Sequence, residues 1–408
     1  MSYKFKLPFL NTLTFNLESL PAFLMLGFCL CIPFSSPLSS VFAVSLIFFY
    51  ILSGDYRQKW LAFKASKIAI FCTLLFAWTL ITGLFSDAES SFLYQDLFKY
   101  KKMLLCIPFF YYMSTKLKRD LIIAYVLGIF IVIGLSLLKG HGFIHLLQTG
   151  EFQYTQSFRI YITEGMHIAL ALFALLYFFK FYPAFRKKLV IPILIILIHA
   201  LFMNGRMGLI SLIVVSIYFS FLLFETIYLK LYFFVFLLIT GVTVYQFSPL
   251  VQLRALRTID EASQIFNPAP VTSIRLQYFQ LSTQLFLKHP IIGNGPGSFK
   301  TANNLRDIDS DLKTHLHTHN EYLTLLSQYG LIGFSLFSLI IFFSTRALYT
   351  DQLNRYREVV FIGLALFLLN CLTDSMVYME AYFLVFLIGL CHVSHESSQV
   401  KSGHPLSV

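Results

Sequence analysis

Apolar runs of about 17–25 residues recur along almost the whole chain, and no other feature limits its fold more. A run of that length crosses roughly 30 Å of hydrocarbon as an α-helix. Hydrophobic residues make up 57% of the sequence and charged residues only 12%, whereas soluble domains carry roughly a quarter charged residues. The alternation over about ten residues that marks a strand of an outer-membrane barrel is missing. The sequence therefore predicts an all-α integral membrane protein.

We expect about twelve transmembrane helices, with ten or eleven as the alternative because the second and fourth runs are poorly defined. The expected spans are 20–36, 38–53, 67–85, 101–114, 120–138, 162–181, 189–204, 207–224, 229–247, 320–345, 358–374 and 376–393. They divide the chain into an N-terminal transmembrane bundle of about nine spans (1–247), a large loop (248–319), C-terminal transmembrane helices (320–393) and a tail (394–408). The start of the chain lacks a small-residue cleavage site, so we expect it to be retained.

Lysine and arginine residues gather in alternate connections between the spans, and the positive-inside rule assigns those connections to the cytoplasm. These residues are Lys4, Lys6, Arg57, Lys59, Lys64, Lys67, Lys116, Lys118, Arg119, Lys180, Arg186, Lys187, Lys188, Lys230, Arg346, Arg355, Arg357 and Lys401. Both termini are then cytoplasmic, and the loop 248–319 lies outside. The net charge of +11 follows from this distribution. It does not indicate nucleic-acid binding, because no folded soluble domain with a basic face is present.

The most polar stretch of the chain directly precedes the tenth expected span. His315, His317 and His319 alternate there, and Asn320 follows the last of them. Histidine titrates near neutral pH and can accept a proton from a hydroxyl group. Alternating histidines can also bind a metal ion, but the nearest acidic residues, Asp307, Asp309, Asp311 and Glu321, do not form a clear ligand set with them. We therefore expect neither a metal nor a cofactor.

Several arginines occur on the side of the membrane that carries the histidines, Arg159, Arg206 and Arg275 among them. Arg206 stands in a short turn, Asn204–Gly208, between two apolar runs. Basic residues prefer the cytoplasmic side, so a cation at the outer edge of the membrane indicates a function. Arginine at such a position can also simply reach lipid headgroups. Because the guanidinium fork suits phosphate, arginines near a histidine are consistent with a lipid-linked phosphate or diphosphate substrate attacked by a hydroxyl group.

The loop 248–319 contains one expected amphipathic helix, 272–288, which Thr272 or Ser273 can cap. Pro290 follows it and opens a glycine-rich segment, 289–299. Such a segment can present backbone N–H groups to phosphate, but we favour a plain turn.

Several further polar residues carry weaker expectations. Glu164 and His167 could be residues whose polar groups are hydrogen-bonded within the bundle, or they could be site residues. Asp374 and Glu380 flank a short turn and are expected to be turn residues. Lys99, Lys101 and Lys102 could attract an anion or anchor a helix at the headgroups. The six cysteines lie in or beside apolar runs, where a thiol behaves as a small hydrophobe, and no disulfide framework is expected.

The motif from His319 to Gly333 resembles that of the O-antigen ligase and polymerase superfamily of bacterial inner-membrane glycosyltransferases. Its ligases carry a His followed by Asn, Ser or Gln, then nine residues, then Gly-x-x-Gly. Here the matching residues are His319, Asn320, the nine residues 321–329, Gly330 and Gly333. Arg206 in its Gly-Arg-x-Gly turn and Arg275 ahead of the glycine-rich segment resemble the family's outer arginines. His317 departs from the small residue or proline frequent at that position.

This resemblance implies a GT-C-like, metal- and ATP-independent transferase with its active site in the periplasm. It would move a preassembled O-antigen from undecaprenyl pyrophosphate to a sugar hydroxyl of lipid A-core, with inversion. The resemblance makes His319 the general base, with His317, Asn320, Gly330 and Gly333 in support. It makes Arg206, Arg275 and, with less support from the motif, Arg159 the ligands of the diphosphate. A polymerase of lipid-linked chains, a protein O-oligosaccharyltransferase and a non-catalytic lipid-glycan transporter remain as alternatives.

Overall fold

The computed structural model describes residues 4–5, 13–14, 19–140, 161–201, 206–247, 273–305, 317–351 and 354–391, together with the single positions 252, 256, 259 and 263. The helices are α1 (Leu20–Cys31), α2 (Ser36–Leu52), α3 (Tyr56–Ala65), α4 (Lys67–Gly83), α5 (Ser90–Leu97), η2 (Lys99–Leu105), α6 (Cys106–Tyr112), α7 (Thr115–Gly140), α8 (Tyr161–Phe181), η4 (Pro183–Phe185), α9 (Arg186–Leu201), α10 (Arg206–Leu223), α11 (Ile227–Phe247), α13 (Ile274–Lys288), α14 (Ser298–Asn304), α16 (Glu321–Thr350), α17 (Arg357–Asn370) and α18 (Met376–Cys391). Two short strands, β1 (Lys4–Phe5) and β2 (Leu13–Thr14), pair antiparallel. The predicted all-α membrane protein is confirmed as a fold class.

Each of the twelve apolar ranges overlaps a described helix, but the ranges differ in how well they fit a membrane span. The fourth range is a 3₁₀ helix, η2, followed by the short helix α6. Among the described residues, α7, α8 and α16 are long and apolar enough to cross a membrane, and α2 with α3 adds a fourth if that pair, bent by 119°, is one span. Four other apolar helices have only 10–17 residues. The count of about twelve spans therefore stays a prediction.

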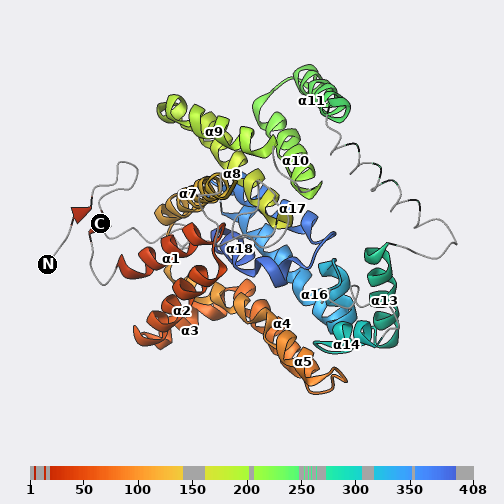
Figure 1. The fold of residues 1–408 in the computed structure, drawn as a ribbon. Coiled ribbons are helices and arrows are strands. Elements are labelled where there is room, and N and C mark those ends of the chain that lie inside the picture. The colour runs from red at the N-terminus through yellow and green to blue at the C-terminus, as the bar shows by residue number, and fades with distance from the viewer. Residues whose placement is uncertain are drawn as a thin grey trace.

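Helix α18 forms the centre of the bundle, with α1, α7, α8, α16 and α17 around it (Figure 1). Its side chains are buried on all sides from Ala381 to Cys391, as expected of a helix that is apolar around its whole circumference. Close approach of backbones tightens the packing elsewhere. A Cβ on Gly165 of α8 would lie 2.3 Å from the Cα of Gly208 of α10, so these two glycines let the first turns of their helices touch. The six cysteines are buried and free.

Helix α16 is broken at Gly330, whose φ of 64° and ψ of −167° are not helical. A side chain is excluded there, since a Cβ would lie 2.3 Å from the carbonyl oxygen of Ile291. The break removes helical hydrogen bonds on both sides of Gly330, and buried backbone groups need other partners. The first glycine of the Gly-x-x-Gly motif is therefore required by the backbone conformation.

The glycine-rich segment 289–298 supplies those partners. On the N-terminal side of the break, the amides of Asn294 and Gly295 donate to the carbonyls of Ser327 and Gln328, at 3.1 and 2.8 Å. On the other side, the amides of Leu331 and Ile332 donate to the carbonyls of Pro290 and Ile291, at 2.8 and 3.2 Å. The carbonyl of Tyr329 accepts from the indole of Trp78 at 2.9 Å. The segment is thus a turn that packs on α16, and its Asn294 and Gly295 amides serve the helix and not a phosphate.

The expected helix 272–288 is α13, which begins at Ile274 after Ser273. It packs on α16 and, through a small apolar cluster, on α14; the cluster consists of Tyr278, Leu281, Leu285 and Phe299. Ser273 occupies the N-cap position but makes no side-chain capping hydrogen bond. The segment before the histidines is thus fixed to the bundle by both an apolar cluster and the turn at Gly330.

We predict that Gly330→Ala destabilises the protein by at least about 1–2 kcal/mol, because alanine at positive φ is strained and its Cβ would overlap Ile291. Gly134→Ala in α7 is the matched control, since nothing lies within 4 Å of its Cβ position. That change should leave stability equal or raise it by up to about 1 kcal/mol. Thermal unfolding of the purified variants in detergent measures both. Equal midpoints for the two variants would contradict the assigned role of Gly330.

Candidate functional site

The residues that carry the histidines are fastened to the turn between α17 and α18. Asn320 caps α16, with its Oδ1 accepting from the amide of Leu323 at 3.0 Å, and its Nδ2 donates to the carbonyl of Leu372 at 3.0 Å. The hydroxyl of Thr318 lies 2.6 Å from that of Thr324 and 3.4 Å from that of Ser375. His319 adopts a left-handed conformation with a φ of 53°. Such a conformation is uncommon for a residue other than glycine, and these contacts hold it in place.

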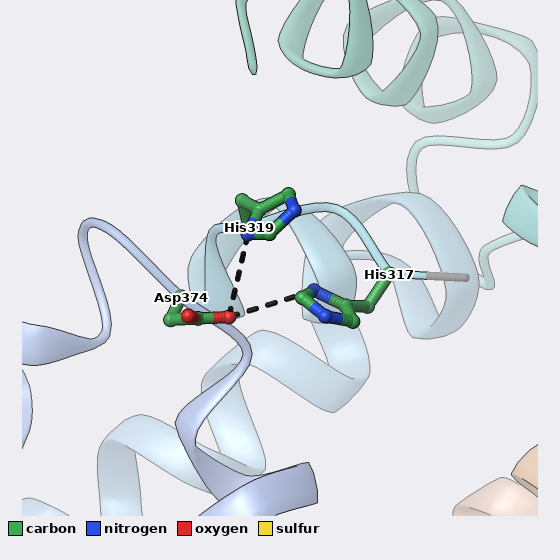
Figure 2. A group of neighbouring side chains, drawn as sticks. All are labelled: His317, His319 and Asp374. Atoms are coloured by element: carbon green, nitrogen blue, oxygen red, sulfur yellow. Dashed lines mark ion pairs between the residues drawn. The ribbon is translucent and has the colours of Figure 1, made fainter. Parts of the chain in front are cut away.

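His317 and His319 share one carboxylate, that of Asp374. Their Nδ1 atoms lie 3.5 and 3.6 Å from the same Oδ1 atom of Asp374, as Figure 2 shows. The two ring centroids are 4.2 Å apart. Asp374 is fully buried, whereas the side chains of His317 and His319 are 23% and 13% exposed. A buried anion is thus placed behind two imidazoles that reach the surface.

Tyr278 of α13 covers the other side of His319. The two rings are nearly parallel, with centroids 6.0 Å apart and an angle of 8° between them. Arg275 lies three residues before Tyr278 on the same helix, and residues with that spacing share a helix face. The structure therefore places the predicted phosphate ligand Arg275 one turn along α13 from the ring that contacts His319.

Arg206 is the first residue of α10, and the structure describes its backbone. Five residues further on, Ser211 accepts a hydrogen bond from Asn370 Nδ2 at 3.4 Å. The carbonyl of Asn370 in turn accepts from the amide of Asp374 at 3.1 Å. Asn370 therefore links Ser211 of α10 to the backbone of Asp374, the residue beside the histidines. Arg159 and His315 lie outside the described residues.

Glu321, directly after Asn320, is buried within a polar junction. Its Oε1 accepts from the hydroxyl of Tyr100 at 2.9 Å, and its Oε2 accepts from the amide of Val377 at 3.1 Å. Its own amide donates to the carbonyl of Cys371 at 2.9 Å. Glu321 thereby joins η2 to the first turn of α18, immediately after Asp374.

Lys99 belongs to a neighbouring ion cluster. Lys300 of α14 and Lys99 approach the same oxygen of the buried Asp96, at 2.7 and 3.6 Å. Burial lowers the pKa of Lys300, and the carboxylate of Asp96 opposes that shift. Lys101 is exposed, and Lys102 lies 4.8 Å from the ring centre of Tyr382. Asp96 of α5 therefore ties α14 to η2 through Lys300 and Lys99, and the side chain of Lys99 is buried in this cluster.

The polar residues expected inside the bundle are satisfied by one another. Glu164 lies 3.2 Å from His199, and His167 lies 3.1 Å from Glu380. His167 is also 2.8 Å from the hydroxyl of Tyr125. Glu380 is buried at a kink of α18, where its φ of −125° and ψ of 30° are not helical. Asp374 does lie in the turn before α18, but its carboxylate is buried against the histidines.

Three ligand atoms of His317, His319 and Asp374 lie within 4.8 Å of one another. Two imidazoles and a carboxylate can hold a divalent cation with one open position. The same arrangement suits an imidazole base whose Nδ1 faces a carboxylate, leaving its Nε2 for a substrate proton. The geometry thus permits both chemistries, which differ in their response to a chelator.

Comparison with known families gives one match: residues 191–338 match the family model described as O-antigen ligase. This match supports an assignment to the O-antigen ligase family. The matched segment contains Arg206, Arg275, the glycine-rich segment and the whole motif from His319 to Gly333. No curated protein matches the chain.

Asp374 lies beyond the family segment and was missed as a site residue by the sequence analysis. One signal was available: a lone carboxylate at the junction of two expected spans, a position at which charge usually has a function. Nothing in the sequence pattern indicated that Tyr278 and Tyr100 would reach His319 and Glu321. These contacts join helices that are far apart in the chain.

We predict that Glu321→Ala destabilises the protein by about 2–4 kcal/mol, because two buried donors, of Tyr100 and Val377, lose their acceptor at about 1–3 kcal/mol each. Glu321→Gln retains an acceptor oxygen and should lose less than half as much. Thermal unfolding in detergent tests the order of the two variants. Equal losses would show that the hydrogen bonds of Glu321 contribute little.

Proposed function

We propose that this chain is an O-antigen ligase that transfers preassembled O-antigen from undecaprenyl pyrophosphate to a sugar hydroxyl of lipid A-core. The observation that carries the proposal is the placement of His319 between Asp374 and Tyr278, within a segment of the O-antigen ligase family. A partly exposed imidazole backed by a buried carboxylate is suited to accept the proton of an attacking hydroxyl group.

The proposed reaction proceeds by direct displacement. The acceptor hydroxyl gives its proton to Nε2 of His319 while its oxygen forms a bond to the anomeric carbon of the donor. The bond from that carbon to the diphosphate breaks, the electron pair leaves on the diphosphate oxygen, and the anomeric centre inverts. Asp374 orients the ring through Nδ1 and stabilises the imidazolium. Arg206 and Arg275, with Arg159 as a third, stabilise the charge of the leaving group.

The membrane arrangement is part of the same proposal. About twelve spans cross the inner membrane, both termini are cytoplasmic, and the active site is periplasmic. The N-terminal bundle comprises 1–247, the periplasmic loop 248–319, the C-terminal helices 320–393 and the cytoplasmic tail 394–408. The distribution of lysine and arginine supports this orientation. His319, Asp374 and the first residue of α10 lie at one end of the bundle, where Asn370 links them.

The deciding experiment is reconstitution of the purified protein with lipid-linked O-antigen and lipid A-core in the presence of a chelator. Glycan on lipid A-core supports the ligase. Longer lipid-linked chains would indicate a polymerase. Transfer to added protein would indicate a protein O-oligosaccharyltransferase, and the absence of any transfer would indicate a binder or transporter. Activity that is lost in chelator and regained with a divalent cation would assign His317, His319 and Asp374 to a metal.

We predict that His319→Ala lowers transfer by about 10²–10⁴-fold, the usual contribution of a general base, while donor binding is retained. Asp374→Asn should also lower transfer strongly, because the amide cannot stabilise the imidazolium. His289→Ala is the control, since His289 is an exposed histidine of the same loop, and it should retain activity. A His319→Ala variant that transfers at the normal rate would overturn the mechanism. Loss of activity in His317→Ala alone would move the role of base to His317.

We predict that Arg206→Lys and Arg275→Lys each weaken donor binding about tenfold or more. An ammonium group retains the charge but cannot replace the two parallel hydrogen bonds of a guanidinium, and hydrogen bonds to charged groups contribute about 1.5–3 kcal/mol. Arg346→Lys, an exposed position near the C-terminal end of α16, is the matched control. Binding is measured with purified lipid-diphosphate donor. An unchanged affinity would remove the substituted arginine from the proposed site.

A further inference from the structure

A groove with a cavity of about 410 Å³ lies between α7, α8 and α9. This volume falls within the roughly 300–1,000 Å³ of small-molecule sites. Apart from Arg119, Tyr182 and Lys188, all of its lining side chains are hydrocarbon, among them Ile123, Phe130 and Ile195. Leu127 and Ile191, two of the lining residues, are 51% and 67% exposed. The groove therefore opens at the surface of the bundle.

The polar residues of the groove lie at one of its ends. Arg119 is in the first turns of α7, Tyr182 directly follows α8, and Lys188 is in the first turn of α9. Asp120 pairs with Arg119 at 3.0 Å, but the adjacent turn adds Lys180, Arg186 and Lys187. Arg186 donates to the carbonyls of Phe179 and Lys180 and so caps α8. The end of the groove remains positively charged after the acidic residue is counted.

This end is opposite to the one that carries the proposed active site. Glu164 in the first turn of α8 contacts His199 in the last turn of α9, and Gly165 packs on Gly208 near the start of α10. The first turn of α8 therefore lies at the same end of the bundle as Arg206. Tyr182 directly follows the last turn of α8 and so lies at the opposite end of the bundle. The diphosphate of the donor has to reach His319, so the cations of the groove cannot hold it.

We infer that the groove binds an anionic phospholipid of the leaflet opposite the active site. One acyl chain lies against the hydrocarbon residues, and Arg119 and Lys188 bind the phosphate. The hydroxyl of Tyr182 lies at the same polar end of the groove. Basic residues beside an apolar space between helices are the arrangement that recognises anionic headgroups. A zwitterionic lipid fills the apolar part equally well but gains less from the two cations.

The test is native mass spectrometry of the full-length protein in detergent, titrated with phosphatidylglycerol and phosphatidylethanolamine of identical acyl chains. The wild-type protein should retain phosphatidylglycerol in preference. Arg119→Gln with Lys188→Gln should lower that preference by about fivefold for each charge removed. Lys64→Gln with Lys116→Gln is the matched control: it removes the same charge from exposed residues of α3 and α7 that do not line the groove, and the preference should persist.

A second pair of variants tests the apolar part without changing charge. Leu127→Trp fills the groove and should lower the retention of phosphatidylglycerol, whereas Leu138→Trp, exposed on the same helix outside the groove, should not. Equal retention of the two lipids by the wild-type protein would overturn the inference. Two other results would also overturn it. If the protein retains a polyprenyl diphosphate that the charge variants release, the occupant of the groove is the donor. If Leu127→Trp dissociates a dimer, the occupant is a second copy of the chain.

Discussion

The break in α16 at Gly330 is the constraint on which the candidate site depends. A helix interrupted inside an apolar bundle leaves backbone groups that no water can satisfy, so each needs a protein partner. The carbonyls of Ser327 and Gln328 and the amides of Leu331 and Ile332 find theirs in the segment 289–298. This requirement fixes the segment 289–298 against α16 through backbone geometry, with little dependence on its side chains.

The position of His319 follows from that attachment. The fixed segment continues from α13, which packs on α16 and brings Tyr278 against the ring of His319. On the other side, Asn320 and Thr318 join the histidine to the turn that carries Asp374. The ring is held between two elements that are anchored independently, a device that limits its rotation without the need for a single strong contact. The left-handed backbone conformation of His319, at the start of a long helix, is tolerated because these several contacts together hold it in place.

The local part of this arrangement could be predicted from the sequence, and the long-range part could not. Apolar periodicity and length located helices over all twelve expected ranges, and proline and glycine marked the turn after α13. The contacts of Glu380 and Asp374 could not be foreseen, because each depends on a partner far away in the chain: His167 for Glu380, and the two histidines for Asp374. A carboxylate at a turn and a carboxylate behind a catalytic imidazole look the same in sequence. Only packing distinguishes them.

We propose that the two histidines beside the shared carboxylate have unequal chemical roles. Both Nδ1 atoms face one oxygen of Asp374, and two imidazolium rings 4.2 Å apart would repel each other. His319 is the more enclosed of the two and contacts Tyr278, so its ring is the better oriented to take a proton in one fixed direction. His317 is more exposed and would form a hydrogen bond with the acceptor sugar in the proposed reaction. In the proposed mechanism the two histidines would serve as one base and one polar contact, both beside Asp374.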